Sequence, residues 1–133
     1  MKKKIVTISI VFFVFLLIGA WVLFDKIFPK ANPINKVEIS RLESINIYDN
    51  EENEIVVSDD ELQQLITCIN GAVPTRTISV NDYPSVRPYY VIEIKTTERL
   101  FRYMLYDDNG ATYVELPYEG VYGIDSVVME FFK

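Results

Sequence analysis

Apolar residues form one long continuous run near the N-terminus. Ile5 to Phe24 contains 20 residues without a charge, and a helix of this length rises about 30 Å, which is the thickness of a bilayer's hydrocarbon core. Lys2, Lys3 and Lys4 precede the run, and basic residues favour the cytoplasmic side. The pattern predicts a single-pass anchor over residues 1–27 that crosses the cell membrane. It places the N-terminus in the cytoplasm and everything that follows outside it.

A cleaved signal peptide has the same basic and apolar order, so secretion after cleavage is the alternative. Ala20 suits the position before a cut, but Ile18 stands where a small side chain is preferred. The apolar run also continues past Ala20 through Phe24. These two features favour a retained anchor.

A short segment rich in turn-forming residues follows the apolar run. Residues 28–36 contain two prolines and two asparagines, which disfavour helix and suit an extended spacer. The remaining residues, 37–133, are enough for one domain with a single core.

The clearest helix signal in this domain begins at Ser58. Ser58 and Glu61 have the spacing of a capping box, and four apolar residues follow at helical spacing: Leu62, Leu65, Ile66 and Ile69. Gly71 is placed to end the helix in a left-handed conformation. The pattern predicts a helix over Asp59 to Asn70.

Most of the rest alternates in the manner of strands. We expect strands at residues 37–47, 54–57, 77–80, 89–96, 99–106, 111–116 and 121–122. Asn109-Gly110 predicts a two-residue hairpin turn that sets Tyr106 opposite Tyr113. A possible Asp125 cap and the apolar spacing of the tail favour a short C-terminal helix. The expected fold is therefore α+β, with a mainly antiparallel sheet and one well-defined helix packed on it.

Charge and composition narrow the functional classes. Residues 37–133 contain 7 Lys or Arg and 18 Asp or Glu, a formal charge of −11. Such acidity argues against electrostatic binding of nucleic acid or of anionic lipid head groups. It suits a cation or a basic partner, although a solvated acidic surface is the more common explanation.

Catalytic and metal-binding residue types are scarce. The chain has no histidine and one cysteine, Cys68, which the apolar pattern places in the core. A serine or cysteine hydrolase therefore lacks its usual base. Ser79 has no suitable partner, and Asp82 fits a turn. We expect no catalytic residues, no metal site and no cofactor. Carboxylate-dependent cleavage of envelope glycans stays as an alternative.

Two segments resemble the paired signatures of a known family. They are Pro74-Thr75-Arg76 with Ser79-Val80-Asn81-Asp82-Tyr83-Pro84, and Tyr113-Val114-Glu115-Leu116-Pro117-Tyr118-Glu119-Gly120-Val121-Tyr122. They are similar to small extracytoplasmic, membrane-associated domains of unknown function in Gram-positive bacteria. The chain departs from the signature at Val121, where isoleucine is expected. The resemblance covers most of residues 38–132 and implies a bacterial membrane-associated domain without an assigned activity.

Tyrosine is the unusual component of the domain. The chain has nine tyrosines, and eight of them lie between residues 83 and 122. Tyrosine is enriched at binding surfaces, although packing within a sheet accounts for several. The candidate binding residues are Arg76, Asp82, Tyr83, Tyr113, Glu115, Tyr118 and Tyr122. For Arg76, an ion pair that orders its loop is favoured over a contact with a partner. We therefore expect a non-enzymatic accessory domain that binds an envelope protein or peptide, with a small-molecule or cation sensor as the alternative.

Overall fold

The structure is a computed structural model that describes residues 2–132. It divides into two compact units, one up to Lys30 and one from Ala31 onward. The elements in chain order are α1 (Lys2–Ile27), the 3₁₀ turn η1 (Ile39–Arg41), β1 (Leu42–Asp49), α2 (Asp59–Asn70), β2 (Val73–Pro74), β3 (Tyr89–Thr96), β4 (Leu100–Asp108), β5 (Ala111–Leu116), β6 (Gly120–Ile124) and the 3₁₀ helix η2 (Ser126–Phe132).

The first unit is the predicted apolar helix. Within α1, residues 7–27 are long and apolar enough to cross a membrane, or to serve as a signal sequence. Their apolar side chains are exposed, including Phe12, Phe15 and Trp21. Nothing in the first unit itself therefore covers this apolar surface.

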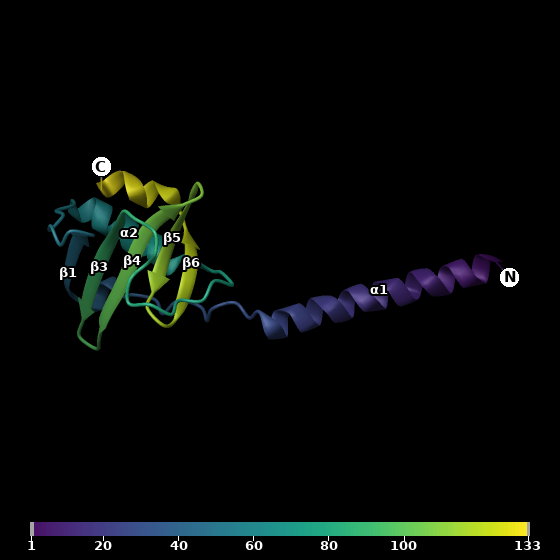
Figure 1. The fold of residues 1–133 in the computed structure, drawn as a ribbon. Helices are drawn as coiled ribbons and strands as arrows, with labels where there is room; N and C mark the ends of the chain where they lie inside the picture. The colour runs from purple at the N-terminus through teal and green to yellow at the C-terminus, as the bar shows by residue number, and fades with distance from the viewer. Residues whose placement is uncertain (1, 133) are drawn as a thin grey trace. The chain divides into compact units, whose positions relative to one another are not determined.

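The second unit is built on one antiparallel sheet, so the expected α+β fold is confirmed. Its six described strands lie in the order β1-β3-β4-β5-β6-β2 (Figure 1). The Asn109-Gly110 turn forms as predicted, because both residues adopt the positive φ angles that this hairpin requires. Tyr106 is then the register partner of Tyr113.

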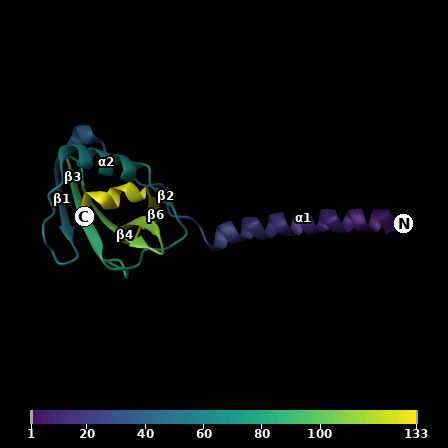
Figure 2. The same ribbon diagram turned by 90° about the horizontal axis from the view of Figure 1, so that it is seen from above.

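The two faces of the sheet have different covers. On the inner face, α2 and η2 pack on alternate strand residues, among them Ile92, Leu105 and Val114 (Figure 2). The opposite face, which we call the outer face, has a second cluster formed by Tyr89, Val91, Met104 and Tyr106. The sheet is thus buried on one face and partly covered on the other.

Helix α2 confirms the predicted bounds and cap. The backbone N–H of Ser58 donates to Glu61 Oε2 at 2.7 Å, and the Glu61 N–H donates back to Ser58 Oγ at 3.4 Å. The Ser58 N–H and hydroxyl lower the pKa of the Glu61 carboxyl. Gly71 differs from the prediction, because its φ of −94° is not left-handed. Its N–H instead donates to the carbonyls of Thr67 and Cys68, each at 3.1 Å.

Three of the expected strands take other forms. Residues 37–41 lie outside the sheet, and β1 begins at Leu42 beside a register shift. Residues 54–57 contribute only an isolated bridge between Tyr48 and Glu54, because Asp49 draws the chain into a tight turn with Asn53. Residues 77–80 belong to a loop. The predicted C-terminal helix forms as 3₁₀, and its two adjacent valines are β-branched residues that disfavour the α-helix.

Residues 31–37, here called the strap, pack against the second unit. The expected spacer over residues 28–36 therefore differs from the structure, because the folded unit already includes Ala31. Ile34 and Val37 are buried in the core. The Asn70 side chain accepts from the Val37 N–H at 2.7 Å and donates to its carbonyl at 3.0 Å. The Asn70 side chain thus satisfies the backbone N–H and carbonyl of Val37, as a neighbouring strand would do in a sheet.

Two buried tyrosines on the inner face differ in how their hydroxyls are satisfied. Tyr122 donates to the Asn32 carbonyl of the strap at 2.9 Å. The Tyr103 hydroxyl is fully buried and has no hydrogen-bond partner among the described residues. Burial raises the pKa of both hydroxyls.

We predict that Tyr103→Phe raises the free energy of unfolding by about 1 kcal/mol, since it removes a buried polar group without a partner. The matched change Tyr122→Phe should lower it by about 1 kcal/mol, since it leaves the Asn32 carbonyl unpaired. Denaturant unfolding of a chain that begins at Pro29 and keeps the strap measures both. Equal effects of the two changes would contradict this assignment.

Candidate functional site

The site is organised by the loop of residues 75–88, which joins β2 to β3 and runs across the outer face. In Figure 1 this teal segment passes in front of the sheet while α2 lies behind it. The loop starts with backbone pairing to β6: the Thr75 N–H donates to the Val121 carbonyl at 3.0 Å, and the Val121 N–H donates to the Thr77 carbonyl at 3.3 Å. Its course is therefore fixed at its beginning by the sheet.

A buried hydrogen bond holds the middle of the loop. Ser79 is 4% exposed and Glu115 is 8% exposed, and the Ser79 hydroxyl donates to Glu115 Oε1 at 2.6 Å. A buried carboxylate without such a donor is costly. The alternation at residues 77–80 is therefore real, but the serine faces inward while Ile78 and Val80 face solvent.

The turn between β5 and β6 is tied to the same loop. The Glu119 N–H donates to the Leu116 carbonyl at 3.0 Å, with Pro117 second in the turn and Tyr118 third. Tyr118 has a φ of 64°, a conformation that is costly for a bulky side chain. Its N–H donates to Ser79 Oγ at 3.3 Å and its hydroxyl donates to Asp82 Oδ1 at 2.9 Å. The loop thus stabilises a strained turn, and Asp82 raises the pKa of the Tyr118 hydroxyl.

Beyond the loop, the outer face carries a groove of about 570 Å³. Its wall includes Tyr48, Tyr83, Arg87, Tyr89, Glu93 and Arg102. The sheet register places most of these side chains, because Tyr48 is the partner of Val91 and Glu93 is the partner of Arg102. The Arg102 guanidinium donates to Glu93 Oε1 at 2.9 and 2.6 Å, which raises the Arg102 pKa.

Aromatic rings and a second arginine complete the groove. The Tyr83 ring lies 5.9 Å from the Tyr89 ring, and the Arg87 guanidinium carbon lies 5.9 Å from the centre of the same ring. Arg87 is exposed and has no carboxylate partner among residues 2–132. Its N–H donors and the exposed Tyr83 ring are therefore available to an oxygen-bearing, partly apolar ligand, whereas Tyr89 is only 7% exposed and packs in the outer-face cluster.

Two of the three acids that line the groove, Asp49 and Glu93, are already engaged. Asp49 accepts from the Asn53 side chain at 2.8 Å and from the backbone N–H groups of Glu51 and Asn53. These bonds lower the Asp49 pKa. A carboxyl that acts as a general acid needs a raised pKa. Glu93 is bonded to Arg102, so neither Asp49 nor Glu93 is arranged for proton donation.

Five of the seven predicted binding residues separate into three groups. Tyr83 lines the groove, whereas Asp82, Glu115 and Tyr118 hold the loop in place. Tyr113 is half-buried, with its ring 5.9 Å from that of Tyr106, in the outer-face cluster. There the pKa of Tyr106 is raised by burial and by the nearby Glu115 carboxylate.

The two remaining predicted residues lie outside the groove. Tyr122 is 1% exposed on the inner face and is closed to a partner, which differs from the role expected for it. Arg76 is half-buried at the start of the loop.

Most groove residues were not among the predicted ones. Tyr48, Arg87, Tyr89 and Arg102 come from three strands and a loop. Period-two alternation shows that Tyr89 and Glu93 share a face. It does not show which face is left open, because that depends on where the loop of residues 75–88 lies.

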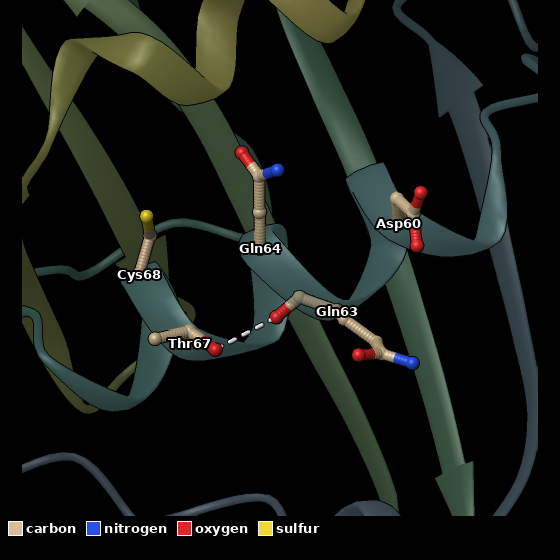
Figure 3. A pocket seen from close by; sticks show the side chains of 5 residues that line it. All are labelled: Asp60, Gln63, Gln64, Thr67 and Cys68. Atoms are coloured by element: carbon tan, nitrogen blue, oxygen red, sulfur yellow. Dashed lines mark hydrogen bonds between the residues drawn. The ribbon is translucent and has the colours of Figure 1, made fainter.

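A separate hollow of about 380 Å³ lies on α2 and is drawn in Figure 3. Its side chains all come from one helix, and the Thr67 hydroxyl donates to the Gln63 carbonyl at 2.8 Å. Cys68 is half-buried here and not fully buried as expected. Burial, with the nearby Asp125, raises its pKa, so the reactive thiolate is disfavoured. Among residues 2–132, no group of three metal-ligating side chains is brought together.

We predict that Ser79→Ala lowers the free energy of unfolding by about 1–3 kcal/mol, because it removes the Ser79 hydroxyl donor from the buried Glu115 carboxylate. Ser85→Ala is the matched control, since Ser85 is exposed in the same loop. Thermal unfolding followed by circular dichroism gives both values. Equal stability of the two variants would contradict a stabilising role for the Ser79 bond.

Comparisons with known proteins place the chain in a family. Residues 25–123 match DUF5301, described as "Domain of unknown function (DUF5300)". A solved structure described as "NMR structure of the protein from Ruminococcus gnavus" is 26% identical, with a TM-score of 0.57, and the match covers 73% of this chain and 99% of that one. No curated protein matches the sequence. Since the matched residues make up more than half of the chain, this protein belongs to the DUF5301 family of unknown function.

Proposed function

We propose that this protein is a membrane-anchored accessory domain of a Gram-positive cell envelope, which binds a protein or peptide segment outside the cell without catalysing a reaction. The observation that carries the proposal is Arg87, an exposed cation without a carboxylate partner among the described residues, above the Tyr89 ring and beside Tyr83. Arginine and tyrosine are the residue types most enriched at the centres of interfaces.

The groove chemistry suits a peptide better than a small rigid ligand. The groove is lined by tyrosine rings and by charged groups of both signs, among them Arg87, Glu93 and Arg102. A peptide segment can present a carboxylate or carbonyl oxygen to Arg87 and an apolar side chain to the exposed ring of Tyr83. The volume of about 570 Å³ accommodates a few side chains.

The membrane attachment rests on α1. Its apolar residues 7–27 span about 30 Å at 1.5 Å per residue. The lysines before the apolar run favour a cytoplasmic N-terminus. This orientation places the groove on the outer side of the membrane.

The proposed topology predicts that, in intact cells, the N-terminus is protected from an added protease and the domain is accessible to it. In intact cells, an added protease should digest a C-terminal epitope tag while an N-terminal tag survives, and alkaline carbonate should leave the full-length chain in the membrane fraction. Release of a chain that lacks the apolar run would instead support signal cleavage and overturn the anchor.

The groove predicts site-specific crosslinking. With the photo-reactive residue benzoylphenylalanine at position 83 of the full-length protein, we expect one saturable adduct in the native host cells. Arg87→Glu should reduce its yield about tenfold or more, because the guanidinium is replaced by a repelling charge.

Arg99→Glu is the matched control. Arg99 is also an exposed arginine above a ring, 4.0 Å from the centre of Phe101, but it lies outside the groove. The control should leave the adduct unchanged. Equal loss in both variants, or no adduct from position 83, would count against the groove as the binding site.

A further inference from the structure

We propose that the loop of residues 75–88 also inserts an apolar tip, formed by Ile78, Val80 and Tyr118, into the surface of the lipid bilayer that holds α1. This inference rests on the proposed anchoring of the chain by α1. It concerns a surface different from the groove, and its partner is the membrane lipid itself.

The first observation is an exposed apolar cluster on a rigid support. Ile78 is 78% exposed, Val80 is 64% exposed and Tyr118 is 67% exposed. Ser79 lies between the two aliphatic residues, and its buried hydroxyl both donates to Glu115 and accepts from the Tyr118 N–H. The two hydrogen bonds of the Ser79 hydroxyl therefore connect the two segments that carry these three exposed side chains. An exposed apolar cluster of this kind indicates an interaction site.

The second observation is where this cluster lies relative to the start of the domain. The Ala31 N–H donates to the Thr75 carbonyl at 3.0 Å. A Cβ at Gly120 would lie 2.5 Å from the Ala31 Cβ, so the strap and the turn are in direct contact. Thr75 is three residues before Ile78, and Gly120 is two residues after Tyr118. The apolar tip is therefore next to the point where the chain enters the domain.

The third observation is the length of the connection. Only Phe28, Pro29 and Lys30 separate the last residue of α1, Ile27, from Ala31. Four residue steps reach at most about 14 Å. The entry point of the domain is thus held close to the membrane surface whatever the orientation of the domain, and the tip next to it is within reach of lipid.

Lipid is favoured over a protein partner by this tether and by side-chain chemistry. A covalent tether gives the tip a high local concentration at the membrane, so a weak insertion is sufficient. Isoleucine and valine suit the acyl region, and tyrosine is enriched at the membrane–water interface. A partner protein would have to reach the same narrow space.

Depth-dependent quenching tests the proposal on the full-length protein. Cys68→Ala removes the native thiol, and a single cysteine at position 78 or 80 carries an environment-sensitive fluorophore. The protein is reconstituted in vesicles of phosphatidylethanolamine and phosphatidylglycerol at a 3:1 ratio, with or without a lipid that carries a nitroxide near the top of its acyl chain. We expect quenching at both positions at least threefold above that of a matched control.

The matched control is a label at Val56. Val56 is apolar and 90% exposed, and it follows the bridge at the outer edge of β1. Strands β1 and β6 are four strand spacings apart in the sheet, or about 19 Å. The control label therefore belongs to the edge of the domain opposite the strap.

The outcomes separate the two proposals. Equal quenching at positions 78, 80 and 56 in protein that stays in the vesicles overturns the inserted tip and leaves the anchor intact. Shielding of position 78 from aqueous iodide without lipid quenching also overturns it, because a protein contact then covers the tip. Protein that does not remain with the vesicles overturns the anchor and this inference together.

Discussion

The hydrogen bond between Ser79 and Glu115 is the interaction on which the outer half of the domain depends. The two residues are 36 positions apart in the sequence, and both are buried. The Ser79 hydroxyl also accepts from the N–H of Tyr118, and together with Asp82 it stabilises the strained φ of that residue. Four residues after Ser79, the same loop contributes Tyr83 to the groove. A loop without helix or strand can form such a defined surface only when its buried polar groups are satisfied.

The strap has a similar role on the inner side. It contributes Ile34 and Val37 to the core, and its Asn32 carbonyl receives the Tyr122 hydroxyl. The family match begins at residue 25, before the strap. The strap itself belongs to the folded unit, which begins at Ala31, so residues 28–30 alone set how far its first residue can lie from the end of α1.

Local signals predicted the elements whose stability is local. Helix α2 combines a capping box with an apolar stripe, and the Asn109-Gly110 hairpin needs only its own two turn residues. The loop of residues 75–88 is different. Its alternation is visible in the sequence, but the inward side is Ser79, and a serine faces inward only because Glu115 is placed opposite by β5. The strap was missed for the same reason, since prolines and asparagines suggest solvent unless their partners, such as Asn70, are known.

Tyrosine abundance also has a physical explanation that composition alone does not provide. A sheet buried on one face and partly covered on the other needs side chains that fill space at one end and reach polar groups at the other. Tyr122 does so toward the strap and Tyr118 toward Asp82, while Tyr83 leaves its ring exposed in the groove beside the buried Tyr89. The groove and the apolar tip share one loop, so a change at Ser79 disturbs both. Ile78 precedes Ser79 in the sequence and Arg87 follows it. A change at Arg87 therefore tests the groove alone, and a change at Ile78 tests the apolar tip alone.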